Sequence, residues 1–226
     1  MSKVLVVAAH SDDEVLGCGG TIAKHVCQGD DVCVVFMTNG VTSRKESPKD
    51  IKLRKYASIS ALKALGVSRH SQFDFPDNRM DTVALLDIVK AIENVVVDFE
   101  PTIVYTHSLH DLNIDHQITN KAVMTVCRPQ TSSTVEKILA FEVLSSSEWN
   151  SPSALSFKPQ YIVDISEHWN AKINALKCYN DEIRNFPHSR SYKTVEALAT
   201  LRGGTNGFDK AEAFFVERIL VGTDTH

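Results

Sequence analysis

Histidines and acidic residues that could bind a metal ion gather in two short segments of the chain. The first segment, His10–Glu14, contains three consecutive acidic residues and directly follows an apolar run. Carboxylates crowded into one turn with an imidazole repel each other unless a positive charge lies nearby, and a divalent metal ion commonly supplies that charge. His10 and Asp13 are three residues apart across a predicted strand-to-helix turn, so both could face one ion. Asp12 should project differently, towards the water molecule that such an ion activates.

The same residues also fit a purely structural role. Ser11 or Asp12 could be the N-cap of the following helix, and Asp13 and Glu14 could interact favourably with its dipole. For an isolated acidic turn this role would be the better explanation. His10 and a matching second segment favour the metal site instead.

The second segment contains three His and two Asp within residues 107–116. His116, with Asp115 beside it, is a natural third ligand. Two His, one carboxylate and an open position for water are typical of a hydrolytic zinc site. His107 and His110 have simpler explanations: one as a rim or substrate-contacting His, the other as a loop residue.

The elements that must position these segments alternate between strand and helix. This alternation predicts an α/β fold with a mostly parallel sheet and helices on both faces. Ligands bind beyond the carboxyl ends of such strands, so both segments should face one crevice. The predicted strands are Lys3–Ala9, Asp31–Thr38, Ser71–Phe75 and Thr102–Thr106, and the predicted helices are Glu14–Gln28, Asp50–Leu65 and Asp81–Phe99.

The pattern changes after about residue 130, where we expect a C-terminal elaboration of the same domain. We interpret residues 1–226 as one domain, with a core over 1–130 and residues 131–226 completing the substrate pocket. In this part the predicted strands are Lys137–Val143 and Tyr161–Ile165, the predicted helices are Ser166–Arg184 (capped by Ser166) and Tyr192–Leu201, and Ala211–Ile219 fits either.

Gly17, Gly19 and Gly20 suggest a nucleotide-binding loop, but their context excludes it. A dinucleotide fingerprint places glycines directly after the strand, whereas here that turn is acidic and would repel a pyrophosphate. We expect these glycines to allow close packing of the first helix on the sheet.

Composition excludes several classes of protein. The 24 basic residues against 28 acidic ones do not favour nucleic acid or an anionic membrane as a constitutive partner. No apolar stretch reaches the ~18 residues that a membrane span needs. The five cysteines are odd in number and form no C-x-x-C pair, so we expect a reduced, cytoplasmic protein.

The motifs resemble a known family. A-H-S-D-D-E-V-L-G-C-G-G (9–20) is similar to the A-H-P-D-D-E signature of the PIG-L/LmbE-like zinc-dependent N-deacetylases, and D-L-N-I-D-H (111–116) resembles their second metal motif. The similarity continues through residues 38–40, 75–77 and 187–191. It implies a Rossmann-like three-layer sandwich without dinucleotide binding, and removal of acetyl groups from N-acetylglucosamine-type amino sugars.

The resemblance also implies roles for individual residues. His10, Asp13 and His116 match the metal ligands, for Zn²⁺ or, with the same ligands, Fe²⁺. Asp12 matches the general base, and Asp115 matches the acid that orients neighbouring groups in the catalytic site.

Two positions depart from the family pattern. Ser11 replaces the usual Pro, and Asn113 stands where many members have a His that stabilises the oxyanion or protonates the leaving amine. Asn can donate a hydrogen bond to an oxyanion but cannot act as a general acid. The proton would then come from Asp12, after it has taken one from water, or from His110 or His188.

The remaining candidates concern substrate binding. Arg44, Arg54 and Arg190 could grip a substrate anion or be solvated or structural residues, and His110 and His188 could contact substrate. The expected partner is a small-molecule amino sugar, and we expect a homo-oligomer. The alternatives are a non-catalytic metal- or sugar-binding module, which an intact Asp12 disfavours, and a related amidohydrolase acting on a non-acetyl amide.

Overall fold

The protein is built on one seven-stranded sheet whose strand order is β3-β2-β1-β4-β5-β7-β6. A computed structural model describes residues 1–38 and 48–222, with side chains described from residue 52 onwards in the second range. The first five strands pair in parallel, β7 is antiparallel to β5, and β6 is antiparallel to β7. The strands are β1 (Lys3–Ala8), β2 (Asp31–Thr38), β3 (Arg69–Phe75), β4 (Ile103–His107), β5 (Lys137–Phe141), β6 (Tyr161–Asp164) and β7 (Ala211–Ile219).

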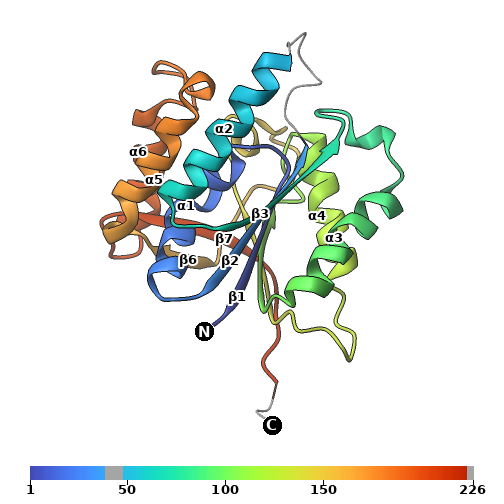
Figure 1. Ribbon diagram of the computed structural model, residues 1–226. Coiled ribbons are helices and arrows are strands. Elements are labelled where there is room, and N and C mark those ends of the chain that lie inside the picture. Colours follow the sequence, from blue (N-terminus) through green and yellow to red (C-terminus); the bar gives the residue numbers. More distant parts are fainter. Residues whose placement is uncertain (39–47, 223–226) are drawn as a thin grey trace.

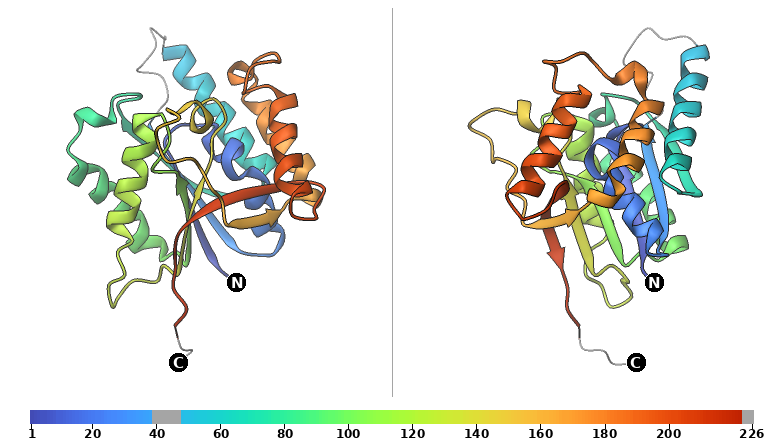
Figure 2. Two further views of the ribbon diagram at one scale, coloured as in Figure 1. Left: turned by 180° about the vertical axis from the view of Figure 1, so that it is seen from behind. Right: turned by 90° about the vertical axis from the view of Figure 1, so that its left-hand side faces the viewer.

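Helices cover both faces of this sheet, as Figures 1 and 2 show. One layer holds α1, α2, α5 and α6, and the other holds α3 and α4. The α-helices are α1 (Asp13–Cys27), α2 (Pro48–Ala64), α3 (Leu85–Phe99), α4 (Ile114–Val126), α5 (Trp169–Cys178) and α6 (Tyr192–Gly204). Short 3₁₀ turns are η1 (Met80–Thr82), η2 (Ser147–Trp149), η3 (Ser166–His168) and η4 (Asn180–Glu182).

The central strands are apolar on both sides because both sides are buried. Val4 and Val6 of β1 pack into the core under α1, whereas Leu5 and Val7 pack into the core under α3 and α4. The three-layer α/β prediction, with a mostly parallel sheet and a C-terminal elaboration, is confirmed.

Several local predictions need correction. Residues 211–219, which fitted either a helix or a strand, form a strand that pairs with both β5 and β6. The helix expected over Ser166–Arg184 is interrupted: α5 ends at Cys178 and only η4 follows. Ser166 does not cap it; instead its N–H and hydroxyl both donate to Oδ1 of Asp164, at 3.0 and 2.6 Å. Helix α4 was not expected at all.

Helix α1 is broken where the glycines lie. Cys18 has φ −146° and ψ 23°, which interrupts the helical backbone. A Cβ on Gly17 would lie 2.3 Å from the Phe141 ring of β5, so the predicted close packing on the sheet is confirmed. This contact leaves no room for a side chain at that position.

A buried ion pair satisfies the backbone groups that the break exposes. Nζ of Lys172 donates to the Leu16 carbonyl at 2.9 Å and to Oε1 of Glu212 at 2.6 Å. Glu212 in turn accepts the N–H groups of Gly20 and Thr21, at 3.0 and 2.7 Å. Strand β7 and helix α5 therefore stabilise helix α1, which begins in the turn after β1.

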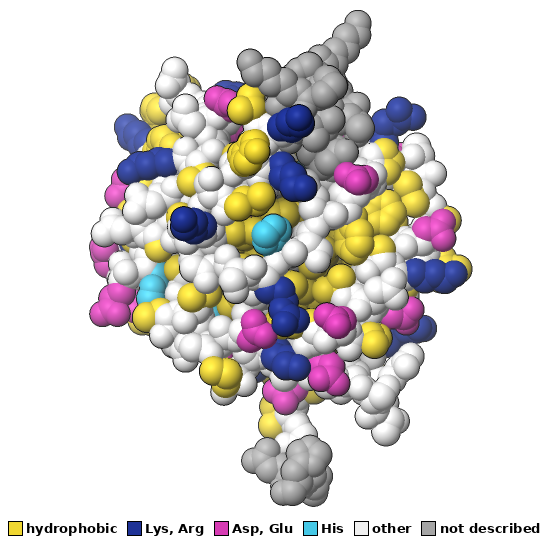
Figure 3. All heavy atoms as spheres, viewed as in Figure 1, with side chains coloured by type: hydrophobic (Ala, Val, Ile, Leu, Met, Phe, Trp, Pro, Cys, Tyr) yellow, Lys and Arg dark blue, Asp and Glu magenta, His cyan; other side chains and the backbone are white. Residues whose placement is uncertain are grey.

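The surface mixes charges of both signs. On the face shown in Figure 3, Lys and Arg side chains are interspersed with Asp and Glu among apolar groups. Within the described residues, no helix combines the length and the apolar composition that crossing a bilayer requires.

Candidate active site

The turn between β1 and α1 holds an unusual backbone conformation. Asp12 has φ 114°, in the left-handed region that non-glycine residues rarely adopt. Its N–H donates to Oε2 of Glu14 at 2.9 Å, and Oε1 of Glu14 accepts from the Tyr179 hydroxyl at 2.6 Å. Burial raises the pKa of Glu14 to about 8. In the turn that these contacts hold, the Asp13 carboxylate faces His10 and the Asp12 carboxylate faces Arg190.

The second segment lies beside the first because β4 pairs with β1. His107 ends β4, and a short loop leads to α4. Oδ1 of Asn113 caps this helix by accepting the N–H of Asp115 at 2.8 Å. Asp115 and His116 therefore lie in its first turn, both buried.

Three of the predicted residues form a group that could hold a metal ion: His10, Asp13 and His116. Nδ1 of His10 lies 3.1 Å from Oδ2 of Asp13, and Nε2 of His116 lies 3.2 Å from that oxygen and 3.3 Å from Nδ1 of His10. Oδ1 of Asp13 is buried and has no hydrogen-bond partner among the described residues. Two imidazole nitrogens and a carboxylate are donors that suit zinc or iron(II).

The electrostatics of this group favour a bound cation. Burial lowers the pKa of both His10 and His116, but nearby carboxylates outweigh it, raising that of His10 well above 6.5 and that of His116 to about 9. The negative potential of the carboxylates is strong enough to hold positive charge in a buried place. A divalent ion would supply that charge and leave both rings neutral, so the residues present fit a metal.

Carboxylates also lie beside the second nitrogen of each of the two imidazole rings. Oδ2 of Asp115 lies 3.0 Å from Nε2 of His10, and Oδ1 of Asp111 lies 3.1 Å from Nδ1 of His116. A carboxylate beside one ring nitrogen favours the tautomer with the proton there, which leaves the other nitrogen free to bind a metal. Burial opposes ionisation of Asp111, but hydrogen bonds from His116, Ser146 and Ser147 lower its pKa to about 2.

The Asp115 carboxylate also accepts hydrogen bonds from the loop after β3. It accepts the N–H of Asn78 at 2.6 Å and that of Met80 at 3.0 Å. Asp115 thus links three segments of the site: the β1 turn, the β3 loop and α4.

His107 lies buried beside the residues that could hold a metal ion, and not on the rim or in a loop as the sequence suggested. It is fully buried, and its ring stacks on that of His116 with 3.8 Å between centroids. Nε2 accepts the N–H of Ala9 at 2.8 Å. Burial lowers its pKa well below 6.5, so the ring is neutral. Its position directly after the predicted strand Thr102–Thr106 was the available signal.

Asp12 points to the other side of the turn and pairs with Arg190. Nη1 of Arg190 lies 2.7 Å from Oδ2 of Asp12, and Nε donates to the Ser145 hydroxyl at 2.6 Å. Burial raises the pKa of Asp12 to about 6, although Arg190 opposes the shift. Glu182 lies 3.9 Å from Nη1 of Arg190 and pairs with Arg54.

A small cavity of ≈ 110 Å³ lies over these groups. Its described lining is His10, Asp12, Arg54, Asp77, Asn78, Asn113, Glu182 and Arg190. The lining thus includes the predicted Asp12, Asn113, Arg54 and Arg190. Asp77 and Asn78 were not among the predicted site residues, although the Phe-Pro-Asp run after the third strand was the signal for them.

The other predicted residues lie elsewhere. Neither His110 nor His188 is among the described residues that line this cavity. Nδ1 of His188 accepts the N–H of Arg190 at 3.0 Å, and its ring meets Trp149 edge-on, with 5.5 Å between centroids. The carbonyl of His110 accepts from Asn150. Arg44 falls outside the described residues.

The chain matches the sequence profile of a known protein family. The profile of PIG-L, described as GlcNAc-PI de-N-acetylase, matches residues 5–127. The chain belongs to the PIG-L family. The resemblance noted in the sequence is thereby confirmed.

Relatives of this PIG-L protein include deacetylases and a hydratase. YaiS of Escherichia coli, named an uncharacterised deacetylase, is 32% identical over 77% of this chain and 88% of its own length. The 4-oxalmesaconate hydratase of Pseudomonas putida is 29% identical over 78% of this chain and 72% of its own length. Diacetylchitobiose deacetylase of Thermococcus kodakarensis is 25% identical over 98% and 85%.

Solved structures share the fold. N,N'-diacetylchitobiose deacetylase from Pyrococcus horikoshii superposes with a TM-score of 0.78 at 20% identity, covering 96% of this chain and 84% of that one. The protein TT1542 from Thermus thermophilus superposes with a TM-score of 0.76 at 23% identity, covering 100% of this chain and 99% of that one.

Proposed function

We propose that this protein is a metal-dependent hydrolase that removes the N-acetyl group from an N-acetylglucosamine-type amino sugar or its conjugate. The products are acetate and a free amine. The observation that carries the proposal is the position of Asp12, a buried carboxylate next to a three-residue metal-binding group. The name of the Thermococcus relative, diacetylchitobiose deacetylase, supports the substrate class.

His10, Asp13 and His116 would hold the metal ion. We propose zinc, and iron(II) fits the same donors. When bound, such an ion acts as a Lewis acid that polarises an amide carbonyl and makes a water molecule easier to deprotonate.

We assign both proton transfers to Asp12. Its carboxylate takes a proton from water as the water oxygen bonds to the carbonyl carbon. When the C–N bond breaks, Asp12 returns that proton to the departing nitrogen, which gives a neutral amine and acetic acid. The acid then loses the second water-derived proton to solvent and leaves as acetate. A pKa near 6 suits a group that must both accept and donate near neutral pH. His110 and His188 are absent from the described cavity lining, which favours Asp12 over either as the acid.

Asn113 is suited to stabilise the carbonyl oxygen. Its own oxygen caps α4, which leaves only the Nδ2 donors for other partners. Nδ2 donates to Oδ1 of Asn78 at 3.1 Å in this structure. A carbonyl oxygen that gains negative charge is a stronger acceptor than an amide oxygen, so we propose that Asn113 turns its donor to the substrate in the transition state.

The Pseudomonas relative raises a second candidate, hydration of a carboxylic acid. The cavity charge disfavours it. Among the described lining residues, three carry carboxylates and two carry guanidinium groups. Both guanidinium groups already face an acidic partner, Arg190 against Asp12 and Arg54 against Glu182. A neutral amide therefore fits the described cavity better than a substrate with several negative charges.

A substrate panel separates the candidates. The metal-loaded protein is incubated with neutral N-acetylglucosamine glycosides, other N-acyl glucosamines and unsaturated dicarboxylic acids, and released acetate, free amine and consumed double bonds are measured. We expect acetate and amine in equal amounts from the glycosides, loss of activity on chelation and recovery with zinc. Consumption of the unsaturated acids without any amide cleavage would establish the hydratase instead.

We also propose a cytoplasmic location and a homo-oligomer. All five cysteines lie in the described part of the chain and are free thiols, as a reducing compartment would keep them. Light scattering coupled to size-exclusion chromatography tests the assembly.

A further inference from the structure

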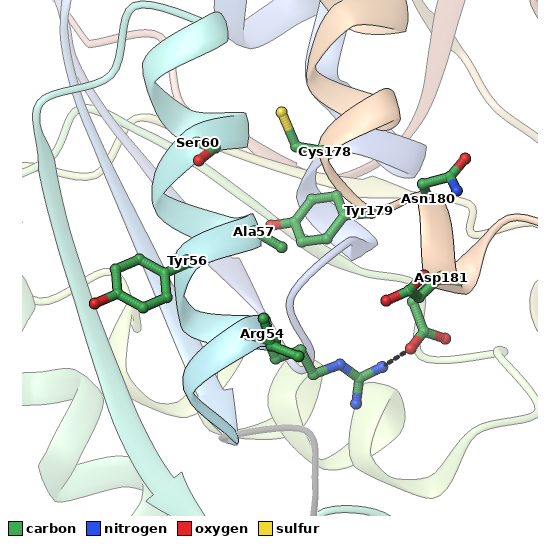
Figure 4. A pocket seen from close by; sticks show the side chains of 10 residues that line it. Arg54, Tyr56, Ala57, Ser60, Cys178, Tyr179, Asn180 and Asp181 are labelled. Carbon is green, nitrogen blue, oxygen red and sulfur yellow. Dashed lines mark hydrogen bonds and ion pairs between the residues drawn. The ribbon is translucent and has the colours of Figure 1, made fainter. Parts of the chain in front are cut away.

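A second, larger cavity opens beside the small one. It measures ≈ 530 Å³ and lies between α2 and the segment from the end of α5 to η4. Figure 4 shows the Tyr179 ring and Ala57 meeting between the two elements. The described lining is Leu53, Arg54, Tyr56, Ala57, Ser60, Cys178, Tyr179, Asn180, Asp181 and Glu182.

The two cavities meet at one ion pair. Arg54 and Glu182 line both of them. In Figure 4 the Arg54 side chain extends from α2 towards η4, where it reaches Glu182. This pair therefore stands between the proposed reaction site and the larger cavity.

The size of the small cavity argues that a substrate extends beyond it. Pockets that bind small molecules usually measure about 300–1,000 Å³. The ≈ 110 Å³ over Asp12 falls below that range, and the ≈ 530 Å³ beside it falls within it. A substrate whose acetamido group lies at Asp12 can place its attached group past the Arg54–Glu182 pair.

The chemistry of the larger cavity indicates what that group is. Its lining combines apolar surface from Leu53, Ala57 and Tyr179 with polar groups from Ser60 and Asn180. A sugar ring offers the matching combination of C–H faces and hydroxyl groups. The described lining holds two carboxylates, Asp181 and Glu182, and one guanidinium, Arg54. An anionic group would face a net negative wall there.

We propose that the cavity between α2 and α5 is the subsite for the group attached to the reacting amino sugar, and that this group is a neutral glycosyl residue. The inference rests on the proposed function for the identity of the reacting sugar. It selects uncharged glycosides over phosphorylated or carboxylated conjugates as substrates.

A volume-filling variant tests the location. Cys178 is half-buried in the cavity wall, and Cys178→Phe would fill part of the space, whereas Cys27→Phe adds the same ring at an exposed cysteine. Both are made in a metal-loaded Asp12→Asn background, and calorimetry gives the Kd of N,N'-diacetylchitobiose and of methyl N-acetylglucosaminide.

We expect the parent to bind the disaccharide about fivefold or more tightly than the methyl glycoside. Cys178→Phe should reduce that preference to less than about twofold, and Cys27→Phe should keep it. A preference that survives Cys178→Phe overturns the proposal, as does a parent that shows none.

A charge reversal tests the neutral character. Asp181 and Asp209 are both exposed, but only Asp181 lines the cavity among the described residues. Asp181→Lys should tighten the binding of N-acetylglucosamine 1-phosphate about five- to tenfold, and Asp209→Lys, with the same total charge, should not. Equal effects of the two variants would show that only the overall charge matters, which contradicts the subsite.

These binding measurements do not depend on turnover. If the wild-type protein releases no acetate from any glycoside, the proposed function fails. A disaccharide preference that disappears with Cys178→Phe would still establish the subsite.

Discussion

Nη1 of Arg190 lies 2.7 Å from Oδ2 of Asp12, across 178 positions of the chain. The pair joins the loop before α6 to the turn that begins α1. The Ser145 hydroxyl accepts from Nε of the same guanidinium, so hydrogen bonds fix the plane of the guanidinium at two points. The sequence left Arg190 open between a grip for a substrate anion and a structural residue, and these contacts place it to orient the proposed general base.

Replacing Arg190 should therefore slow the reaction more than it weakens binding. Arg190→Gln should lower kcat about 10- to 100-fold, the range seen for residues that orient a catalytic group, with KM changed less than about threefold. Arg190→Lys, which keeps the charge, should recover part of the rate. Exposed Arg184→Gln is the control. A large rise in KM at unchanged kcat would show that Arg190 binds substrate after all.

Removing the carboxylate behind His10 should weaken metal binding. Asp115→Asn can no longer favour the His10 tautomer that leaves Nδ1 free, so metal affinity should fall about 10- to 100-fold. Competition with a coloured chelator measures it, and Asp87→Asn, at an exposed position of α3, is the control. An unchanged affinity in a folded Asp115→Asn protein would remove Asp115 from this role.

The buried ion pair at the break in α1 should matter greatly for stability. Glu212→Gln leaves Lys172 charged and partly unpaired, which typically costs about 3–5 kcal/mol of the free energy of unfolding. Urea denaturation measures the loss. Glu100→Gln, in the exposed pair with Lys3, should cost less than about 1 kcal/mol. Similar losses for both variants would mean that the break needs no ionic support.

Asp30 should make stability depend on pH. Burial opposes its ionisation, but the Ser2 N–H and His25 outweigh this and lower its pKa below the ordinary 3.8. The ionised form therefore stabilises the fold above that pH, and the contribution is lost as the pH falls through the lowered value.

Asp30→Asn should accordingly cost about 1 kcal/mol at pH 7 and little at a pH below the folded-state pKa, where wild-type Asp30 is also neutral. Thermal or urea unfolding at both pH values measures this. The adjacent, exposed Asp31→Asn is the matched control. A cost for Asp30→Asn that persists in acid would contradict the lowered pKa.

The sequence predicts the sheet well, and it also picks out the three residues that could hold a metal ion, because both depend on local patterns. Apolar runs specify β1 and β2, and the positions of His10, Asp13 and His116 follow from strand ends that a parallel sheet brings together. Helix α4 escapes prediction because its buried face mixes polar residues, such as Thr119 and Asn120, with apolar ones.

Long-range partners could not be read from the sequence. The sequence shows that residue 190 is a cation. Its pairing with Asp12 depends on how the whole C-terminal part of the chain folds back, which the sequence does not show. The same holds for Lys172 inside the break of α1, and for Tyr179 and Asp181 in the larger cavity, which the sequence placed within one uninterrupted helix.

The central claim is that Asp12 moves protons in a metal-dependent deacetylation. The most direct test compares acetate release by wild-type and Asp12→Asn proteins loaded with equal, independently measured amounts of zinc. The wild type should turn over an N-acetylglucosamine glycoside, and Asp12→Asn should be slower by about 10²- to 10⁴-fold. An Asp12→Asn protein that keeps its metal and more than about a tenth of the wild-type rate would contradict the claim.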